Sequence, residues 1–308
     1  MVAEKRTLGA ILAVVAGVGW GTMAPTVKAI LVSSPLFGAL TLSLARGLWA
    51  IPFLAVVALL ARPRSTPLRR VDLLSFLAIA LLAAFGLNLL FQIAIAKTSA
   101  AHAVLFQGLS PLALAALEAI VFRRPLDRQR TFGLAFGVAG IALLAFGRSS
   151  EGASLAGDAI MLVWLAIFAA YSLLTLRLVA RFSPLFTSAF GWGLGFVLLS
   201  LSGAQLIPQV ARDTFATPLY AAGIIGGLAF LTAVCAPALH AISLRLTSVA
   251  IVTAASQYAS IATGVALSLF VLHESLAPAG IAGAVLLLVS LTLTVVPLRV
   301  AGGRGEPG

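Results

Sequence analysis

The tetrapeptide Ser34-Pro35-Leu36-Phe37 occurs a second time as Ser183-Pro184-Leu185-Phe186, an offset of 149 residues (34 to 183). Further along, the offset becomes 150, so that Gln107 matches Gln257 and Ser110 matches Ser260. Apolar identities carry little weight in a chain that is 61% hydrophobic, whereas polar side chains that recur inside apolar runs are informative. We therefore expect two structural repeats, at residues 1–150 and 151–300, followed by a disordered tail at 301–308.

The composition is that of a polytopic membrane protein. Only 9% of the 308 residues are charged, against about 25% in soluble domains. Apolar stretches of about 20 residues follow one another, and each could cross roughly 30 Å of hydrocarbon as a helix. Backbone groups in lipid must be hydrogen-bonded internally, which favours helices. The sequence predicts an all-α membrane protein with ten transmembrane helices, at 8–32, 35–60, 71–96, 99–121, 131–147, 158–179, 184–202, 218–240, 246–271 and 277–297.

The basic residues predict how the chain is oriented. Its formal charge of +11 comes from Lys and Arg scattered over short loops, unlike a nucleic-acid-binding domain. With the N-terminus inside, fifteen of the 20 basic residues fall on the cytoplasmic side and only Lys97, Arg148 and Arg212 on the outer side. This bias predicts that both termini are cytoplasmic. Because each repeat has five predicted spans, the second enters from the opposite face, and we expect the repeats to be inverted about an axis in the membrane plane.

The matched polar residues are the first candidates for a binding site. Gln107 and Ser110 are three residues apart and share a helix face, and Gln257 and Ser260 occupy the matching face of the second repeat. A buried amide in lipid is costly unless it meets a partner or a water-filled cavity. Two interpretations remain open: the four residues line a common cavity, or they join helices by hydrogen bonds. Pro111, directly after Ser110, is expected to bend or break its helix.

Other polar and aromatic residues in the middle of spans extend this candidate site. Asn88 and Gln92 lie four apart on one face of span 71–96, where cavity lining and helix contacts are equally open. Aromatic side chains would suit an apolar or aromatic substrate, or would simply pack. We include the mid-span aromatic residues Trp20, Phe168, Tyr171 and Tyr258, and leave Trp49, Trp164 and Trp192 as packing or interfacial-belt residues.

Arg46 is the most demanding residue for a membrane position. It lies near the middle of span 35–60, where insertion scales assign an Arg a cost of about 2.5–3.5 kcal/mol. It must therefore face protein, water or a bilayer defect. Glu118, near the inner end of span 99–121, is the one acidic residue well inside a predicted span. An Arg46–Glu118 pair, a carboxylate-binding role for Arg46 and a coupling role for Glu118 all remain open.

Several classes of site have no support in the sequence. His102, His240 and His273 are scattered without a metal-ligand pattern, and there is no Gly-rich nucleotide cradle. We expect no metal, no cofactor and no nucleotide-binding site, and we do not expect an enzyme. A membrane-embedded lipid enzyme would need a nucleophile–base pair or a metal cluster near the interface. The single Cys235 excludes an internal disulfide. No motif specifies an oligomeric state.

Several motifs together resemble a known family. They are Trp20-Gly21 followed by Lys28, the stretch from Ala94 to Ala101 (AIAKTSAA), Leu109-Ser110-Pro111-Leu112, Gly133 to Gly140, and Leu272-His273-Glu274-Ser275-Leu276. The chain resembles EamA-type carriers of the drug/metabolite transporter superfamily, and within it exporters of aromatic and other bulky neutral amino acids. The resemblance implies ten helices, inverted repeats and a secondary carrier in a bacterial-type cytoplasmic (inner) membrane. Two positions depart from the family pattern: Arg124 replaces a turn Glu, and Ile261 replaces a Pro.

These observations lead to a functional hypothesis. We expect a carrier that exports amino acids or related small metabolites by alternating access, with a largely apolar central cavity in which Gln107, Gln257, Asn88 and Ser110 orient polar groups. Small-residue contacts, such as those of Gly133 and Gly137, would let the halves move against each other. The alternative is a passive facilitator or channel for small solutes.

Overall fold

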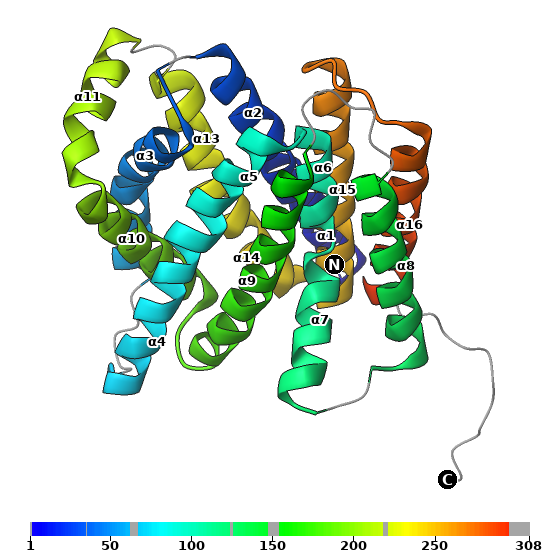
Figure 1. The fold of residues 1–308 in the computed structure, drawn as a ribbon. Helices are drawn as coiled ribbons and strands as arrows, with labels where there is room; N and C mark the ends of the chain where they lie inside the picture. Colours follow the sequence, from blue (N-terminus) through cyan, green and yellow to red (C-terminus); the bar gives the residue numbers. More distant parts are fainter. Residues whose placement is uncertain are drawn as a thin grey trace.

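The computed structural model describes residues 2–34, 36–61, 67–123, 126–146, 154–217 and 221–295, and within these ranges every regular element is a helix. The helices form a single bundle (Figure 1). The first half contains α1 (Val2–Gly21), α2 (Met23–Ser33), α3 (Ala39–Leu60), α4 (Arg70–Leu81), the π-helix η1 (Leu82–Leu90), α5 (Phe91–Lys97), α6 (Ala100–Gly108), α7 (Ser110–Val121) and α8 (Arg128–Phe146). The second half contains α9 (Leu155–Val179), α10 (Pro184–Ser202), η2 (Ala204–Leu206), α11 (Ile207–Ala216), η3 (Ala221–Gly226), α13 (Gly227–Phe230), η4 (Leu231–Cys235), α14 (Ala236–Leu246), α15 (Val249–Phe270) and α16 (Pro278–Val295).

The expectation of an all-helical membrane protein is confirmed. Among the described residues, seven helical segments are long and apolar enough to cross a membrane, and the bent pair α6–α7 makes an eighth. The segments are Glu4–Ser33, Ala39–Leu60, Arg70–Lys97, Leu155–Val179, Pro184–Ser202, Gly223–Leu246 and Pro278–Val295. The helices α8 and α15, which occupy the predicted spans 131–147 and 246–271, are not among them. The count of ten spans therefore stays a prediction, and the predicted tail at 301–308 lies outside the described residues.

Proline breaks the fourth predicted span as expected. The helices α6 and α7 meet at an angle of 43° around Leu109. Pro111 has no N–H to donate to the carbonyl of Gln107, one helical turn earlier. The Ser110 hydroxyl donates to that carbonyl instead. The Gln107 carbonyl is therefore paired despite the break, and Gln107 and Ser110 lie at the bend.

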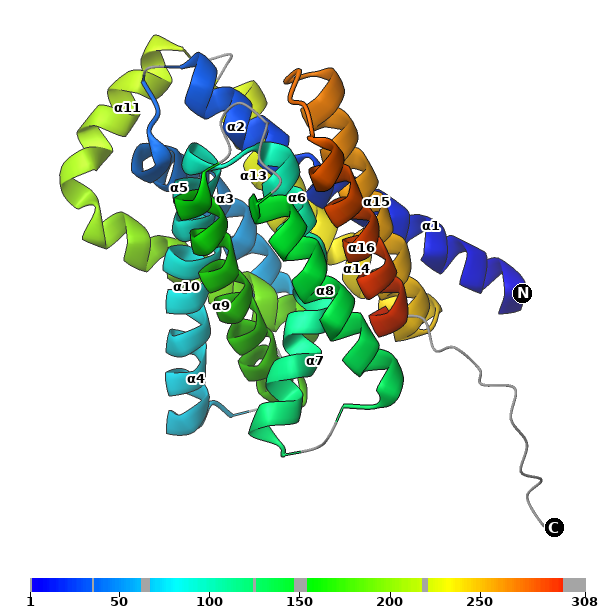
Figure 2. The ribbon, with the colours of Figure 1, turned by 45° about the vertical axis from the view of Figure 1, so that its right-hand side comes forward.

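Two local features could not be read from the predicted spans. The connection between the predicted spans 184–202 and 218–240 contains η2 and the helix α11, which lies at the edge of the bundle away from the N-terminal end of α1 (Figure 2). The two copies of the tetrapeptide also differ locally. Ser183 caps α10 by accepting from the Phe186 N–H at 3.2 Å, whereas α3 begins only at Ala39, after the N-cap Gly38.

Glycines allow several helices to approach each other closely. The helix α8 packs along α16, as both views show (Figures 1 and 2), and α1 packs against α15. A methyl group at Gly140 would lie 2.9 Å from the carbonyl oxygen of Gly283, and one at Gly17 would lie 2.2 Å from that of Ser256. Both distances are too short for a carbon atom, so these crossings require glycine. The expected small-residue contact of Gly133 is present, because the Ser290 hydroxyl donates to the Gly133 carbonyl at 2.7 Å.

Candidate functional site

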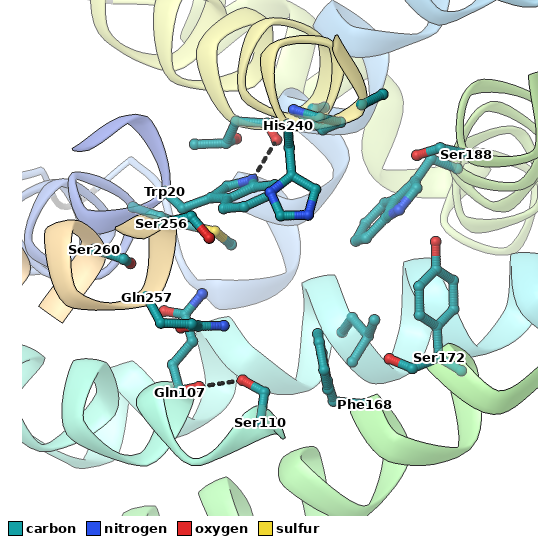
Figure 3. A pocket seen from close by; sticks show the side chains of 18 of the residues that line it. Trp20, Gln107, Ser110, Phe168, Ser172, Ser188, His240, Ser256, Gln257 and Ser260 are labelled. Atoms are coloured by element: carbon teal, nitrogen blue, oxygen red, sulfur yellow. Dashed lines mark hydrogen bonds between the residues drawn. The ribbon is translucent and has the colours of Figure 1, made fainter. Parts of the chain in front are cut away.

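A cavity of about 480 Å³ lies inside the bundle and is lined by both halves of the chain. Figure 3 shows part of its wall. The lining side chains are mainly apolar and aromatic, with a few amides, hydroxyls, one guanidinium and one imidazole. They belong to Trp20, Met23, Arg46, Leu87, Phe91, Gln107, Ser110, Pro111, Leu114, Trp164, Phe168, Tyr171, Ser172, Pro184, Leu185, Ser188, Trp192, Phe196, Thr232, Ala233, Pro237, His240, Ala241, Leu244, Thr253, Ser256, Gln257 and Ser260.

The matched polar residues of the two halves meet at this cavity. Gln107, Ser110, Gln257 and Ser260 all line it, and Figure 3 shows the two glutamine side chains close together on one side. The Oε1 atom of Gln107 is buried and has no hydrogen-bond partner in the structure. An unsatisfied amide oxygen at a cavity wall is available to a ligand or to water, since burying it without a partner is costly.

The guanidinium of Arg46 forms a second polar feature of the wall. Its Nη1 donates to Asn88 Oδ1 at 2.9 Å and its Nη2 donates to Thr232 Oγ1 at 3.2 Å. Gln92 Nε2 donates to the same Asn88 oxygen at 3.1 Å. Asn88 lies in η1 and Thr232 in η4. Both oxygen partners of Arg46 therefore come from π-helical segments, which are frequent at functional sites.

Aromatic rings form much of the remaining wall. Trp164 and Phe168 stack with centroids 5.5 Å apart and an interplanar angle of 30°, and Trp20 and His240 lie 5.2 Å apart. The indole nitrogens are fixed: Trp164 Nε1 donates to the Leu87 carbonyl at 3.1 Å, and Trp20 Nε1 donates to the Thr232 carbonyl at 3.3 Å. Because the rings are held in place, the apolar part of the cavity is largely preformed.

The structure brings most of the predicted site residues together, but not all. Trp20, Phe168 and Tyr171 line the cavity together with the polar residues above. Three others lie outside its lining. Asn88 accepts hydrogen bonds from Arg46 and Gln92, and the Tyr258 hydroxyl is hydrogen-bonded to Thr292 Oγ1 at 2.5 Å. Glu118, half-buried on α7, is also not in the lining, and in the described part of the chain Arg46 bonds Asn88 and Thr232 rather than Glu118.

Several lining residues were not predicted. Trp164 and Trp192 were left as packing or interfacial residues, but both line the cavity, and Trp164 is only 4% exposed. Small hydroxyl residues such as Ser172 and Ser188, both labelled in Figure 3, were missed because a lone serine in an apolar run also occurs at ordinary helix contacts. Ser172 could have been found from its position in the middle of the predicted span 158–179, four residues after Phe168, whereas Ser188 lies near the start of span 184–202 and carries no such signal.

A separate group of polar residues lies away from the cavity, where the ends of α5, α6 and α9 meet the loop before α16. We call it the Glu274 cluster; it consists of Lys28, Thr98, Ser99, His102, Asp158 and Glu274. Glu274 accepts from the backbone N–H groups of Ala100 at 2.8 Å and Ala101 at 2.9 Å. The Thr98 hydroxyl donates to Asp158 Oδ1 at 2.6 Å, with His102 Nδ1 3.3 Å from the same carboxylate.

The Glu274 cluster joins the two halves of the chain. Lys28 Nζ donates to the carbonyls of Ile95 at 3.1 Å and Thr98 at 2.8 Å. Ser99 accepts from the His102 N–H at 3.1 Å. With Glu274 on the two preceding amides, the first three N–H groups of α6, which have no partner within the helix, are all satisfied. The cluster is therefore a well-bonded seal between segments far apart in sequence.

No group of three or more His, Cys, Asp or Glu side chains that could hold a metal ion is found in the described part of the chain. The cavity wall contributes amides, hydroxyls, one guanidinium and rings. Such a wall can bind and orient a small solute. It offers no adjacent nucleophile and carboxylate base within the lining described here.

Comparisons with known proteins give one family match, one curated relative and one similar solved structure. Residues 7–146 match the EamA-like transporter family. The uncharacterized transporter YyaM of Bacillus subtilis (strain 168) is 26% identical over 192 residues, which cover 61% of this chain and 62% of YyaM, so the match spans less than two thirds of that relative. A crystal structure of a protein of unspecified function has a TM-score of 0.55 and 18% identity over 96% of this chain and 99% of its own, which is a likeness of fold. On these matches, residues 7–146, which are less than half of the chain, are similar to the EamA-like transporter family.

Proposed function

We propose that this chain is a secondary transporter of the cytoplasmic membrane that exports bulky neutral amino acids or related small metabolites by alternating access. The observation that carries the proposal is the cavity of about 480 Å³, which is lined from both halves and contains the matched polar residues Gln107 and Gln257. A cavity of this size is in the range that holds small metabolites. The match of residues 7–146 to a transporter family supports the same conclusion.

Helix contacts support two inverted repeats. With the offset of 150, Gly133 corresponds to Gly283 and Gly140 to Ser290. The Gly133–Ser290 contact then corresponds to the Gly283–Gly140 contact, and both are close approaches between α8 and α16. A contact that maps onto another contact with its two partners exchanged is what a twofold axis between the repeats would produce.

A second pair of contacts supports the same axis. With the offset of 149, Leu44 corresponds to Gly193 and Leu54 to Gly203. A methyl group at Gly203 would lie 2.9 Å from Leu44, and one at Gly193 would lie 3.6 Å from Leu54. One contact joins α3 to α10 and the other joins α3 to Gly203, the C-cap of α10; α3 and α10 correspond to the second predicted span of each repeat. The proposed axis therefore passes between α3 and α10 as well as between α8 and α16.

The position of the cavity supports alternating access. On α9 the Glu274 cluster involves Asp158, whereas the cavity is lined farther along the helix, from Trp164 to Ser172. The lining continues to Pro184, the first residue of α10, and to Leu244, close to the end of α14. These two ends adjoin Arg181 and Arg245, which the charge bias assigns to the cytoplasm. We infer that the Glu274 cluster closes the cavity toward the outer side of the membrane and that the cavity extends toward the cytoplasmic side.

The wall chemistry supports a substrate with both a polar and an apolar part. Trp20, Trp164 and Phe168 offer rings for a bulky side chain, and Gln107 and Gln257 offer amide groups for hydrogen bonds. A hydrophobic pocket with a few convergent polar groups is typical of small-molecule sites. The substrate class follows from the resemblance to amino-acid exporters together with this wall.

Counterflow in proteoliposomes tests the proposal. The purified chain is reconstituted with unlabelled phenylalanine inside, and entry of labelled phenylalanine is measured. We expect labelled substrate to accumulate transiently above equilibrium, which a passive channel cannot produce. Gln107→Ala and Gln257→Ala should each lower the initial rate about tenfold, the effect of one lost hydrogen bond to a polar ligand group. Leu162→Ala, an exposed position on α9, is the matched control. Unchanged rates in both glutamine variants would show that the cavity assignment is wrong.

A further inference from the structure

Arg46 stands out among the residues that line the cavity. Within the described residues it is the only Lys, Arg, Asp or Glu in the lining. Its side chain is buried, with 4% of the residue exposed, and it belongs to a segment long and apolar enough to span a membrane. A charged side chain at such a position normally has an ion partner or faces water, and it often marks a substrate pathway.

The protein holds this guanidinium in place without neutralising it. Its two oxygen partners, Asn88 Oδ1 and Thr232 Oγ1, belong to uncharged side chains. Its Nε is buried and has no hydrogen-bond partner in the structure. The Thr232 hydroxyl is itself anchored, because it donates to the Leu228 carbonyl at 2.7 Å. A fixed cation that has spare donors, lies beside a cavity and has no counter-charge among the described residues is arranged to receive an anion.

The surroundings of Arg46 indicate which anion fits. Trp20 donates to the carbonyl of Thr232 while Arg46 donates to the hydroxyl of the same residue, so the indole and the guanidinium meet at Thr232. The rest of the wall is mainly aromatic and aliphatic. A planar guanidinium binds carboxylates with two parallel hydrogen bonds. An anion attached to a bulky apolar group satisfies both parts of the wall.

The lining also indicates which charge the ligand does not need. No carboxylate of the described residues lines the cavity, so an ammonium group would find amide and hydroxyl oxygens, the His240 imidazole and aromatic faces, but no opposite charge. A ligand whose only charge is positive would lie in the same cavity as the unneutralised Arg46. Like charges within a low-dielectric cavity repel strongly.

We propose that Arg46 is the carboxylate-binding residue of the cavity, and that the ligand is a small organic carboxylate with an aromatic or bulky aliphatic group, for which an α-ammonium group is not required. This inference rests on the proposed transport function, because it identifies the chemical class carried by the same cavity. It narrows that function to carboxylates and excludes organic cations.

Three probes with the same phenyl-ethyl skeleton separate the charges. They are 3-phenylpropionate, which carries only a carboxylate, L-phenylalanine, which carries both groups, and phenethylamine, which carries only the ammonium. Binding to the purified full-length chain is measured by calorimetry at one pH and salt concentration. We expect the two carboxylates to bind and the amine to bind at least tenfold more weakly. Binding of the amine equal to that of phenylpropionate, or binding of phenylalanine without binding of phenylpropionate, would overturn the proposal.

Variants assign the effect to Arg46. Arg46→Gln should weaken binding of phenylpropionate about tenfold or more, since a charge-assisted hydrogen bond is lost. Arg46→Lys keeps the positive charge and should therefore retain part of the affinity for phenylpropionate. Arg177→Gln removes an equal charge from an exposed position on α9 and should leave binding unchanged. The comparison of the three probes needs no variant, so it remains decisive if Arg46→Gln does not fold. Unchanged binding in a folded Arg46→Gln would contradict the assignment.

Binding and transport can fail independently. If phenylpropionate binds through Arg46 but no solute shows counterflow, the proposed transport function fails while the carboxylate site stands. If counterflow is observed and Arg46→Gln leaves its rate unchanged, transport stands and the assignment of Arg46 is wrong.

Discussion

Replacing Glu274 by glutamine should loosen the start of α6. The carboxylate accepts two backbone N–H groups, from Ala100 and Ala101, at 2.8 and 2.9 Å. A hydrogen bond to a charged group contributes about 1.5–3 kcal/mol, and a negative charge at a helix N-terminus adds about 0.3–1 kcal/mol. Glutamine keeps one acceptor oxygen and loses the charge. We therefore expect the loss of about 2 kcal/mol, which increases the open population about 30-fold.

Hydrogen–deuterium exchange measures this opening directly. The peptide that contains Ala100 and Ala101 should exchange about 30-fold faster in Glu274→Gln, because amide exchange follows local opening when closing is fast. Glu118→Gln is the matched control, since it makes the same chemical change on a half-buried residue that lies outside the Glu274 cluster. Equal exchange of this peptide in both variants would refute the view that Glu274 seals the two halves together.

Two further predictions concern helix packing and the fixed rings. Gly140→Val should lower the melting temperature in detergent by several degrees, equivalent to about 1–3 kcal/mol of overpacking, because a methyl group there would already lie 2.9 Å from the Gly283 carbonyl oxygen. Ala139→Val changes an exposed neighbouring residue and should leave the melting temperature unchanged. Equal melting temperatures of the two variants would contradict the close crossing of α8 and α16. Trp164→Phe should cost about 1 kcal/mol in unfolding free energy because it removes the bond to the Leu87 carbonyl and leaves that oxygen without this donor, and an unchanged stability would show that water replaces the indole.

The membrane fold could be predicted because it depends on composition and on the length of apolar runs. The break at Pro111 followed from a missing N–H, and the meeting of Gln107 with Gln257 followed from the repeat. Helix α11 was missed because its ten residues include polar and charged side chains and Pro208, a pattern shared by ordinary loops. A proline in the first turn of a helix is well tolerated, so its presence did not exclude a helix.

The partners of Arg46 could not be predicted from the sequence. Glu118 was considered because opposite charges attract, but Arg46 instead bonds Asn88 and Thr232, which are 42 and 186 residues away in the chain. Which helix faces meet depends on the rotation of each helix, and the π-helical segments η1 and η4 change that rotation locally. Apolar patterning does not encode such a shift, so the side chains that meet Arg46 could not be identified beforehand.

The Glu274 cluster favours one conformation of the substrate-free protein over the other. The offset of 149 matches Asp158 with Gly9, where a methyl group would already lie 2.9 Å from Thr247 and no carboxylate has room. On the proposed mechanism, the seal on one side therefore contains a charged hydrogen bond that its counterpart lacks. A free-energy difference of only about 1.4 kcal/mol between the two substrate-free conformations would leave roughly nine in ten molecules in the conformation that is closed on the outer side. Such a bias sets where the unloaded protein pauses in its cycle, while the concentration gradient still decides which way solute flows.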